Sequence, residues 1–240
     1  MEVTPLASLS LTHVSYNPSD PLSYLCAWLA LVPQTLCIIY VTLLYSSREI
    51  EILLMFAGQL ACEAFNFALK RLIRQERPRV MNGKGYGMPS SHAQFMSYFA
   101  VSLGLFLLVR HRPPGGRTGG GGHGPQERVL GSLLVAGLAV AVAASRVYLS
   151  YHTPVQVGVG CAAGVGCAVA WFVVTGWLRR EGWVDWTLET RLAGLGRWRD
   201  LLVEEDLPEG GWRRWMDRRE EKKKSTIANG FDTDKGRKQR

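Results

Sequence analysis

Five long, mostly apolar stretches constrain the fold of this chain more than any other feature. They cover residues 24–46, 50–69, 93–109, 129–148 and 155–178. A helix of about 20 apolar residues is long enough to cross the ~30 Å hydrocarbon core of a bilayer. Hydrophobic residues make up 47% of the chain, and their bunching into these stretches favours a membrane protein over a soluble domain. We therefore predict an all-α, polytopic membrane bundle of about five transmembrane helices.

Polar segments flank and interrupt the predicted bundle. Residues 1–23 contain no Lys or Arg, so we expect an N-terminal segment followed by an uncleaved first span. Residues 24–178 form the predicted transmembrane domain. Within it, the Gly-rich and Arg-rich residues 110–128 are expected to be a disordered loop with solvated histidines at His111 and His123. Residues 179–240 are predicted to be a basic, partly disordered tail.

Charge and cysteine content limit which binding partners and which cysteine roles are expected. The net charge is +8, and the basic residues lie in loops and the tail beside the spans. Lipid headgroups and phosphate are therefore the expected partners rather than nucleic acid. All five cysteines lie in apolar stretches without metal-type spacing and are expected to be small buried hydrophobic residues: Cys26, Cys37, Cys62, Cys161 and Cys167.

A polar segment, residues 145–156, joins the fourth and fifth apolar stretches. It places Arg146 and His152 at a membrane boundary. An arginine there is expected to face a cavity, a partner or a ligand, because facing lipid costs a few kcal/mol. Two simpler interpretations stay open: Arg146 can extend to the headgroups, and His152 can be an ordinary interfacial histidine.

A second polar segment follows the second span and ends in Arg77-Pro78. Lys70 and Arg77 are seven residues apart, so they share one face if the helix continues to Pro78. Arg71 and Arg74 lie on other faces and are expected to meet lipid headgroups. Glu63, within the span, is either paired inside the bundle or an electrostatic partner for Lys70 or Arg77.

A third segment, Pro89-Ser90-Ser91-His92, precedes the third span. Serine before a helix is a common N-cap, which gives Ser90 and Ser91 a structural interpretation. The free backbone N–H groups at the same helix start also form an anion site. Both interpretations can hold at once.

The three segments together contain K-x6-R-P, P-S-x-H and S-R-x5-H. This triple resembles the signature of the type-2 phosphatidic acid phosphatase superfamily, and the last segment is most similar to the dolichyl diphosphatases of the endoplasmic reticulum. The resemblance implies phosphoryl transfer in which His152 attacks phosphorus and His92 protonates the leaving group and then activates water. The expected phosphate-binding residues are Lys70, Arg77, Ser90, Ser91 and Arg146.

Two positions depart from the superfamily pattern. Ser91 stands where the superfamily usually has Gly, and Gln156 stands where it usually has Asp. A neutral amide at Gln156 can orient the imidazole of His152 but cannot stabilise an imidazolium as a carboxylate does. Glu63 is one candidate to compensate. No metal or cofactor is expected, because side-chain cations take the place of a divalent ion.

Five spans put the two termini on opposite sides of the membrane and all three motif segments on one side. The loop at 110–128 and the residues that follow the last span are rich in Arg, whereas residues 1–23 have none, so loop and tail are predicted to be cytosolic. The N-terminal segment and the motifs then face the lumen of the endoplasmic reticulum.

The expected activity is hydrolysis of membrane-anchored dolichyl diphosphate to dolichyl phosphate, which recycles the carrier for protein glycosylation. Broader hydrolysis of phosphatidate, sphingoid phosphate or sugar phosphate is an alternative. From other classes, a non-catalytic lipid-binding protein or a vanadate-dependent peroxidase also stays open. The five intact motif residues argue against a degenerate site, and the spans argue against a soluble peroxidase.

Overall fold

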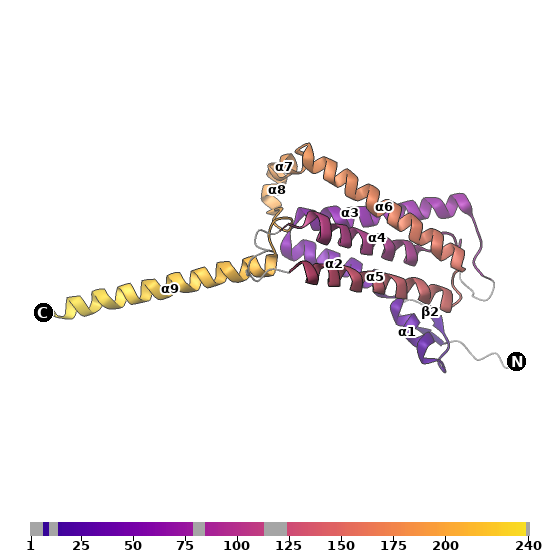
Figure 1. Ribbon diagram of the computed structural model, residues 1–240, viewed down its shortest axis with the longest axis horizontal. Helices are drawn as coiled ribbons and strands as arrows, with labels where there is room; N and C mark the ends of the chain where they lie inside the picture. Colours follow the sequence, from indigo (N-terminus) through magenta and orange to yellow (C-terminus); the bar gives the residue numbers. More distant parts are fainter. Residues whose placement is uncertain (1–6, 10–13, 79–84, 113–123, 239–240) are drawn as a thin grey trace.

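The computed structural model describes residues 7–9, 14–78, 85–112 and 124–238 and is a bundle of long helices (Figure 1). Within these described residues, five helical segments are long and apolar enough to cross a membrane, which confirms the predicted all-α membrane bundle. The first consists of two helices, α1 and α2. These elements are α1 (Pro21–Leu29), α2 (Val32–Ser47), α3 (Ile50–Ile73), α4 (Ser91–Leu105), which continues into the π-helical turn η1 (Phe106–Arg110), α5 (Pro125–Tyr148) and α6 (Pro154–Arg180).

The first span is broken near its start. α1 ends at Leu29 and α2 begins at Val32, so Pro33 lies in the first turn of α2, where its missing N–H needs no helical partner. A single helix through Pro33, predicted from the apolar stretch, is therefore wrong at this point. The break exposes the backbone carbonyl of Ala30 to the interior of the bundle.

α4 is the central helix and packs against α3, α5 and α6. Its closest neighbour is α6, because two glycines of α6 face the α4 backbone. A Cβ at Gly160 would lie 2.7 Å from the carbonyl oxygen of Ser90, and Gly164 abuts the carbonyl of Gln94 in the same way. These two glycines let the backbones of α4 and α6 approach closely, whereas Gly166 faces open space and has no such role.

A small hairpin covers one end of α1. Strands β1 (Ala7–Leu9) and β2 (Val14–Tyr16) pair antiparallel. Val14 belongs to a buried apolar cluster with residues of α1 and with Leu149, just after α5. The N-terminal segment is therefore packed against the end of the bundle that carries the motifs.

The region after the last span contains α7 (Trp183–Leu188), α8 (Arg191–Gly196) and α9 (Leu207–Lys238). Figure 1 shows α9 extending away from the bundle. Between α8 and α9 the chain docks on the loop ends of the bundle. There the buried ring of His111 lies 2.7 Å, through Nδ1, from the carbonyl oxygen of Leu202, so the predicted solvated His111 is wrong. Of the predicted disordered loop 110–128, the structure describes residues 110–112 and 124–128, and α5 already begins at Pro125. Residues 113–123, with His123, lie outside the described residues.

The two ends of the bundle differ in content. The site end comprises residues 70–78, 85–92 and 146–156, which lie together with β2 and α1 (Figure 1). The tail end comprises residues 47–51, 110–112 and 175–206. All three motif segments therefore lie at one end, as the span count predicts.

Candidate active site

A tight turn between α5 and α6 sets the positions of Arg146 and His152. The backbone N–H groups of Tyr151 and His152 both donate to the carbonyl of Arg146, at 3.0 and 3.2 Å, and Ser150 adopts a left-handed conformation with φ of 57°. The turn doubles back on the last residues of α5. His152 therefore stands immediately before α6, at a fixed distance from the end of α5.

α6 begins with a capping box that rigidifies this turn. The side chain of Thr153 accepts a hydrogen bond from the N–H of Gln156 at 3.2 Å, and Gln156 Oε1 accepts one from the N–H of Thr153 at 3.2 Å. Pro154 occupies the first helical position. The residue before this box is His152, so the cap fixes the backbone that carries it.

The imidazole of His152 is buried, with 4% of the residue exposed. Its Nδ1 lies 2.8 Å from the carbonyl oxygen of Gly87 and 3.3 Å from Oε1 of Gln156. Because both neighbours accept hydrogen bonds, Nδ1 carries the proton and Nε2 keeps its lone pair. Burial and the nearby Arg77 cation lower the pKa of His152 to about 4. The ring is thus neutral at physiological pH, as a nucleophile requires.

Arg146 is 2% exposed and faces the interior of the protein. Its Nη2 donates to the carbonyl of Cys26 at 3.2 Å, its Nε donates to Ser145 Oγ at 3.3 Å, and its guanidinium lies 5.5 Å from the ring centroid of Tyr151. The interpretation in which Arg146 extends to the headgroups is therefore wrong. Tyr151 is in turn held by the N-terminal hairpin, because its hydroxyl accepts from the N–H of Ser15 at 2.7 Å.

Lys70 and Arg77 do not share a helix. α3 ends at Ile73, and Arg74 adopts a left-handed conformation with φ of 52°, so the helix does not continue to Pro78 and the condition for a shared helical face is not met. The chain instead turns after Arg74 and brings Arg77 beside His152, where the cation acts on the ring. Nε of Arg77 is buried and has no hydrogen-bond partner among the described residues.

Ser90 is the N-cap of α4 by its extended backbone, but its side chain makes no capping hydrogen bond. The hydroxyl is buried and unpartnered within the described part of the chain. The N-cap interpretation therefore holds for the backbone of Ser90 and not for its hydroxyl. Ser91 is the first residue of α4, so its N–H is one of the free donors at the helix start.

His92 points toward the break in the first span. Its Nε2 lies 3.2 Å from the carbonyl oxygen of Ala30. His92 also lines a cavity of about 240 Å³ between α2, α3 and α4, together with Pro33, Gln34, Cys37, Glu63, Ser91 and Phe95. The cavity lies within the membrane-spanning part of the bundle and borders the site end.

The predicted residues converge on one place. The charges of Arg146, His152 and Lys70 all act on His92, and those of Arg77 and Lys70 act on His152. Glu63 interacts electrostatically with Lys70 along α3, as one of the two sequence interpretations predicts. Gln156 contacts His152 and supports the predicted orienting contact.

Three contributors were not singled out from the sequence. Gly87 supplies the carbonyl that faces His152, Thr153 caps α6, and Tyr151 stacks on Arg146. Thr153-Pro154-Val155-Gln156 has the spacing of a capping box with Pro at its first helical position, so Thr153 had a readable signal. The contact at Gly87 joins segments 65 residues apart and has no local signal.

Together these features define a class of protein, the membrane enzymes whose site lies at the end of apolar helices. In that site, cations lie beside a neutral imidazole of fixed orientation. Comparison with known proteins places the chain in that class. The model of the PAP2 superfamily matches residues 50–180, more than half of the chain, and the chain belongs to this superfamily. The match runs from the start of α3 to the end of α6, which confirms the resemblance carried by the three motifs.

Individual relatives carry phosphatase names. A Neurospora crassa protein named "Putative dolichyldiphosphatase" is 50% identical, over 93% of this chain and 98% of that protein. Human "Dolichyldiphosphatase 1" is 38% identical over 63% of this chain and 64% of its own. "Lipid phosphate phosphatase gamma" of Arabidopsis thaliana is 34% identical over 68% of this chain and 71% of its own. No solved structure matches the chain significantly.

Proposed function

We propose that this protein hydrolyses dolichyl diphosphate to dolichyl phosphate and phosphate at the lumenal face of the endoplasmic reticulum membrane. One observation carries the proposal: His152 is buried, neutral and held by Nδ1 at the membrane boundary, beside arginines that have no carboxylate partner among the described residues. An imidazole with a free Nε2 beside uncompensated cations suits attack on a phosphate. Relatives named dolichyldiphosphatase support the choice of substrate.

The chemistry follows from these positions. Arg77, Arg146 and Lys70 neutralise the non-bridging oxygens of the terminal phosphate. The Nε2 lone pair of His152 attacks the terminal phosphorus, the bond from phosphorus to the bridging oxygen breaks, and dolichyl phosphate leaves with a proton from His92. Water then attacks the phosphohistidine, His92 takes a proton from it, and phosphate is released with the His152 ring neutral again.

The hydrogen bonds suit these two roles. Gly87 keeps the Nδ1–H of His152 in place, so the attacking atom is always Nε2. In the first step His92 carries a proton on both ring nitrogens: the Ala30 carbonyl accepts from Nε2–H, and the Nδ1 proton goes to the leaving oxygen. The bare Nδ1 then takes a proton from the attacking water. Ser90 Oγ is a buried hydroxyl available to donate to a phosphate oxygen.

The substrate is anchored in the bilayer by its polyprenyl chain, so its route to the site runs through the membrane. The cavity beside His92 borders the α1–α2 break and contains Cys37 and Phe95. We assign it to the first isoprene units, which places the leaving dolichyl phosphate oxygen near His92. The distribution of arginines around the spans supports a lumenal site end.

A broader lipid phosphate phosphatase is the second candidate. It is favoured by the similarity to the Arabidopsis protein named lipid phosphate phosphatase gamma. The cationic residues recognise phosphate and do not by themselves distinguish a diphosphate from a monophosphate.

The test is phosphate release by the purified protein in detergent from dolichyl diphosphate, phosphatidate and sphingosine phosphate, beside His152→Ala. Selective release from the diphosphate, lost in the variant, is the expected result. Equal turnover of the monophosphates would replace the substrate with the broader class, and no release from any would indicate a binding protein. A substrate labelled with ³²P in its terminal phosphate should label the wild type with an acid-labile bond and leave His152→Ala unlabelled.

A further inference from the structure

We propose that Gln156 is a positioning residue for two parts of the site at once: it orients His152, and it holds the segment that carries Arg77. The inference rests on the proposed function only for its activity readouts. Gln156 is 1% exposed, and both ends of its side-chain amide are engaged.

The amide oxygen of Gln156 contacts His152. Oε1 accepts from the N–H of Thr153 at 3.2 Å and lies 3.3 Å from His152 Nδ1. The nitrogen of the amide serves a different part of the chain. Nε2 donates to the carbonyl of Glu76 at 2.9 Å and to Oε1 of Gln75 at 3.3 Å, both just before Arg77.

Gly87 closes the contact from the opposite side. Its N–H donates to the carbonyl of Gln75 at 2.7 Å, and its carbonyl faces His152. A Cβ on Gly87 would stand 2.8 Å from Nε2 of Gln156 and 3.1 Å from Cγ of Arg77. Gly87 lacks a left-handed φ, so the space taken by these two side chains, and not backbone strain, is what requires a glycine here.

The backbone of Gln156 contacts a further motif segment, the one that contains Ser90. Its carbonyl accepts from the N–H of Ser90 at 3.1 Å. One residue thus touches the segments that carry Arg77, Ser90 and His152. No other described residue is hydrogen-bonded to Ser90, to His152 and to the residues just before Arg77.

The chemistry of the amide explains why a carboxylate would not serve here. An ionised carboxylate only accepts hydrogen bonds, so it can hold the Nδ1–H of His152 but cannot donate to Glu76 and Gln75. It would instead place a negative charge next to the carbonyl oxygen of Glu76 and Oε1 of Gln75, which both accept hydrogen bonds. Restoring an acidic group at Gln156 should therefore damage the site rather than improve it.

Gln156→Glu tests this directly, because the two side chains have the same shape. We expect KM to rise about 10- to 100-fold, the factor that corresponds to a lost hydrogen bond at a buried group. The same variant should move the acidic limb of kcat/KM to higher pH, since a carboxylate stabilises the imidazolium of His152. If Gln156 serves His152 alone, kcat is kept or raised and KM does not change, and that result would overturn the proposal.

A readout without substrate separates this inference from the proposed function. Hydrogen exchange at the amide of Gly87, which is bonded to Gln75, should be faster in Gln156→Glu than in the wild type whether or not any lipid is hydrolysed. Unchanged exchange would also overturn the proposal. Gln126→Glu, the same chemical change at an exposed residue of α5, is the matched control and should leave exchange and KM unchanged.

Gly87→Ala is a second route to the same contact if Gln156→Glu folds poorly. The added methyl group must displace the Gln156 amide or Arg77, so KM should rise while thermal unfolding in detergent changes little. A normal KM with a stable Gly87→Ala protein would contradict the role of this contact.

Discussion

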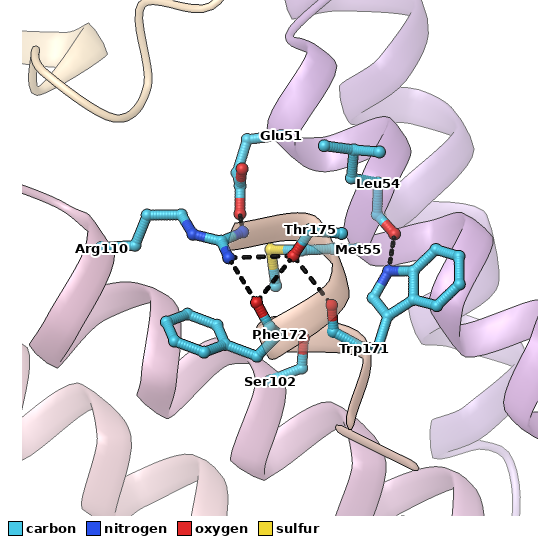
Figure 2. Close-up of a pocket in the computed structure, with 8 residues that line it drawn as sticks. All are labelled: Glu51, Leu54, Met55, Ser102, Arg110, Trp171, Phe172 and Thr175. Carbon is cyan, nitrogen blue, oxygen red and sulfur yellow. Dashed lines mark hydrogen bonds and ion pairs between the residues drawn. The ribbon is translucent and has the colours of Figure 1, made fainter. Parts of the chain in front are cut away.

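The site end and the tail end both carry buried or half-buried arginines at a membrane boundary, yet they treat those charges in opposite ways. At the tail end, Glu51 Oε1 accepts from Arg110 at 2.7 Å and Glu51 Oε2 from Arg179 at 2.5 Å (Figure 2 shows the pair with Arg110). At the site end, Arg77 and Arg146 have no carboxylate within ion-pair distance in the described part of the chain. The comparison distinguishes arginines that are ion-paired within the protein from arginines that are available to bind an anion.

The tail end also provides hydrogen-bond partners for its buried polar groups. Arg110 Nη2 donates to the carbonyl of Phe172 at 3.0 Å and to Thr175 Oγ1 at 2.9 Å (Figure 2). Glu49, fully buried, accepts from Arg199 and from the N–H groups of Leu201 and Leu202. The contacts of Glu49 attach the chain between α8 and α9 to the bundle. Burying a charge without a partner destabilises the folded protein. The unpaired arginines therefore destabilise the site end, and the ion pairs of the tail end avoid this loss of stability.

The largest expected effect is on activity, from removing an unpaired cation. Arg146→Gln should lower kcat/KM by about 10²- to 10³-fold or more, because in the proposed mechanism the guanidinium stabilises charge on the transferred phosphate. Its unfolding temperature in detergent should stay the same or rise, since a buried uncompensated charge is removed. Phosphate release and thermal unfolding measure the two effects.

Arg110→Gln is the matched control for this prediction. It removes an arginine of the tail end and leaves Glu51 with one partner fewer, so stability should fall and kcat/KM per folded molecule should change far less. A loss of stability in Arg146→Gln as large as that in Arg110→Gln would remove the distinction between the two ends.

The second prediction concerns stability at the tail end. Glu51→Gln leaves Arg110 and Arg179 without their shared carboxylate and should cost about 3–5 kcal/mol of unfolding free energy. Thermal or denaturant unfolding in detergent measures this cost. Glu209→Gln, which breaks only the exposed pair with Arg213 on α9, should cost about 0.3–0.5 kcal/mol. Equal losses in the two variants would show that the buried cluster is not structural.

The third prediction uses the protonation of His152, whose pKa is lowered to about 4. Because the proposed mechanism needs His152 neutral as the nucleophile, the acidic limb of kcat/KM should lie near pH 4 instead of near 6.5, the ordinary value for histidine. Arg77→Gln removes a cation that disfavours the imidazolium, so the limb should move to higher pH. The shift should be partial, since burial is the larger cause.

Residual activity of Arg77→Gln against pH tests the direction of this shift, and NMR titration of the His152 ring tests it without turnover. Arg74→Gln, an exposed arginine three residues earlier, is the control and should leave the limb in place. A limb that moves to lower pH in Arg77→Gln would contradict the placement of Arg77 beside His152.

The sequence predicted the parts of the molecule that local patterns govern. Apolar length predicted the spans, and three short motifs pointed to the histidines and cationic residues that the fold brings together at the site end. It failed where tertiary contacts decide the conformation. Docking of the chain near Leu202 buries His111, and these two residues are 91 apart in the sequence, so no local pattern reports the contact. The end of α3 before Arg77 does have a local signal, because Pro78 disfavours helix at the residue before it.

The paired arginines of the tail end show the same limit in another form. Arg110 and Arg179 were counted as loop charges for topology, yet both are bound to Glu51, which is 59 and 128 residues away in the chain. Sequence shows which charges lie near membrane boundaries. Only the fold shows which of them are already neutralised.

The smallest expected effect extends the comparison from phosphate to lipid, in the cavity beside His92. Cys37→Phe should fill part of this space of about 240 Å³ and raise KM for dolichyl diphosphate by about 10-fold, as expected for losing the burial of a few methylene groups. Hydrolysis of a short, soluble prenyl diphosphate should change little, because its chain needs less of the cavity. Ile38→Phe, at the next residue but 68% exposed, is the control for bulk added to α2. Equal effects on long and short substrates would show that the isoprene units lie elsewhere, and the cationic site end would then recognise phosphate without help from this cavity.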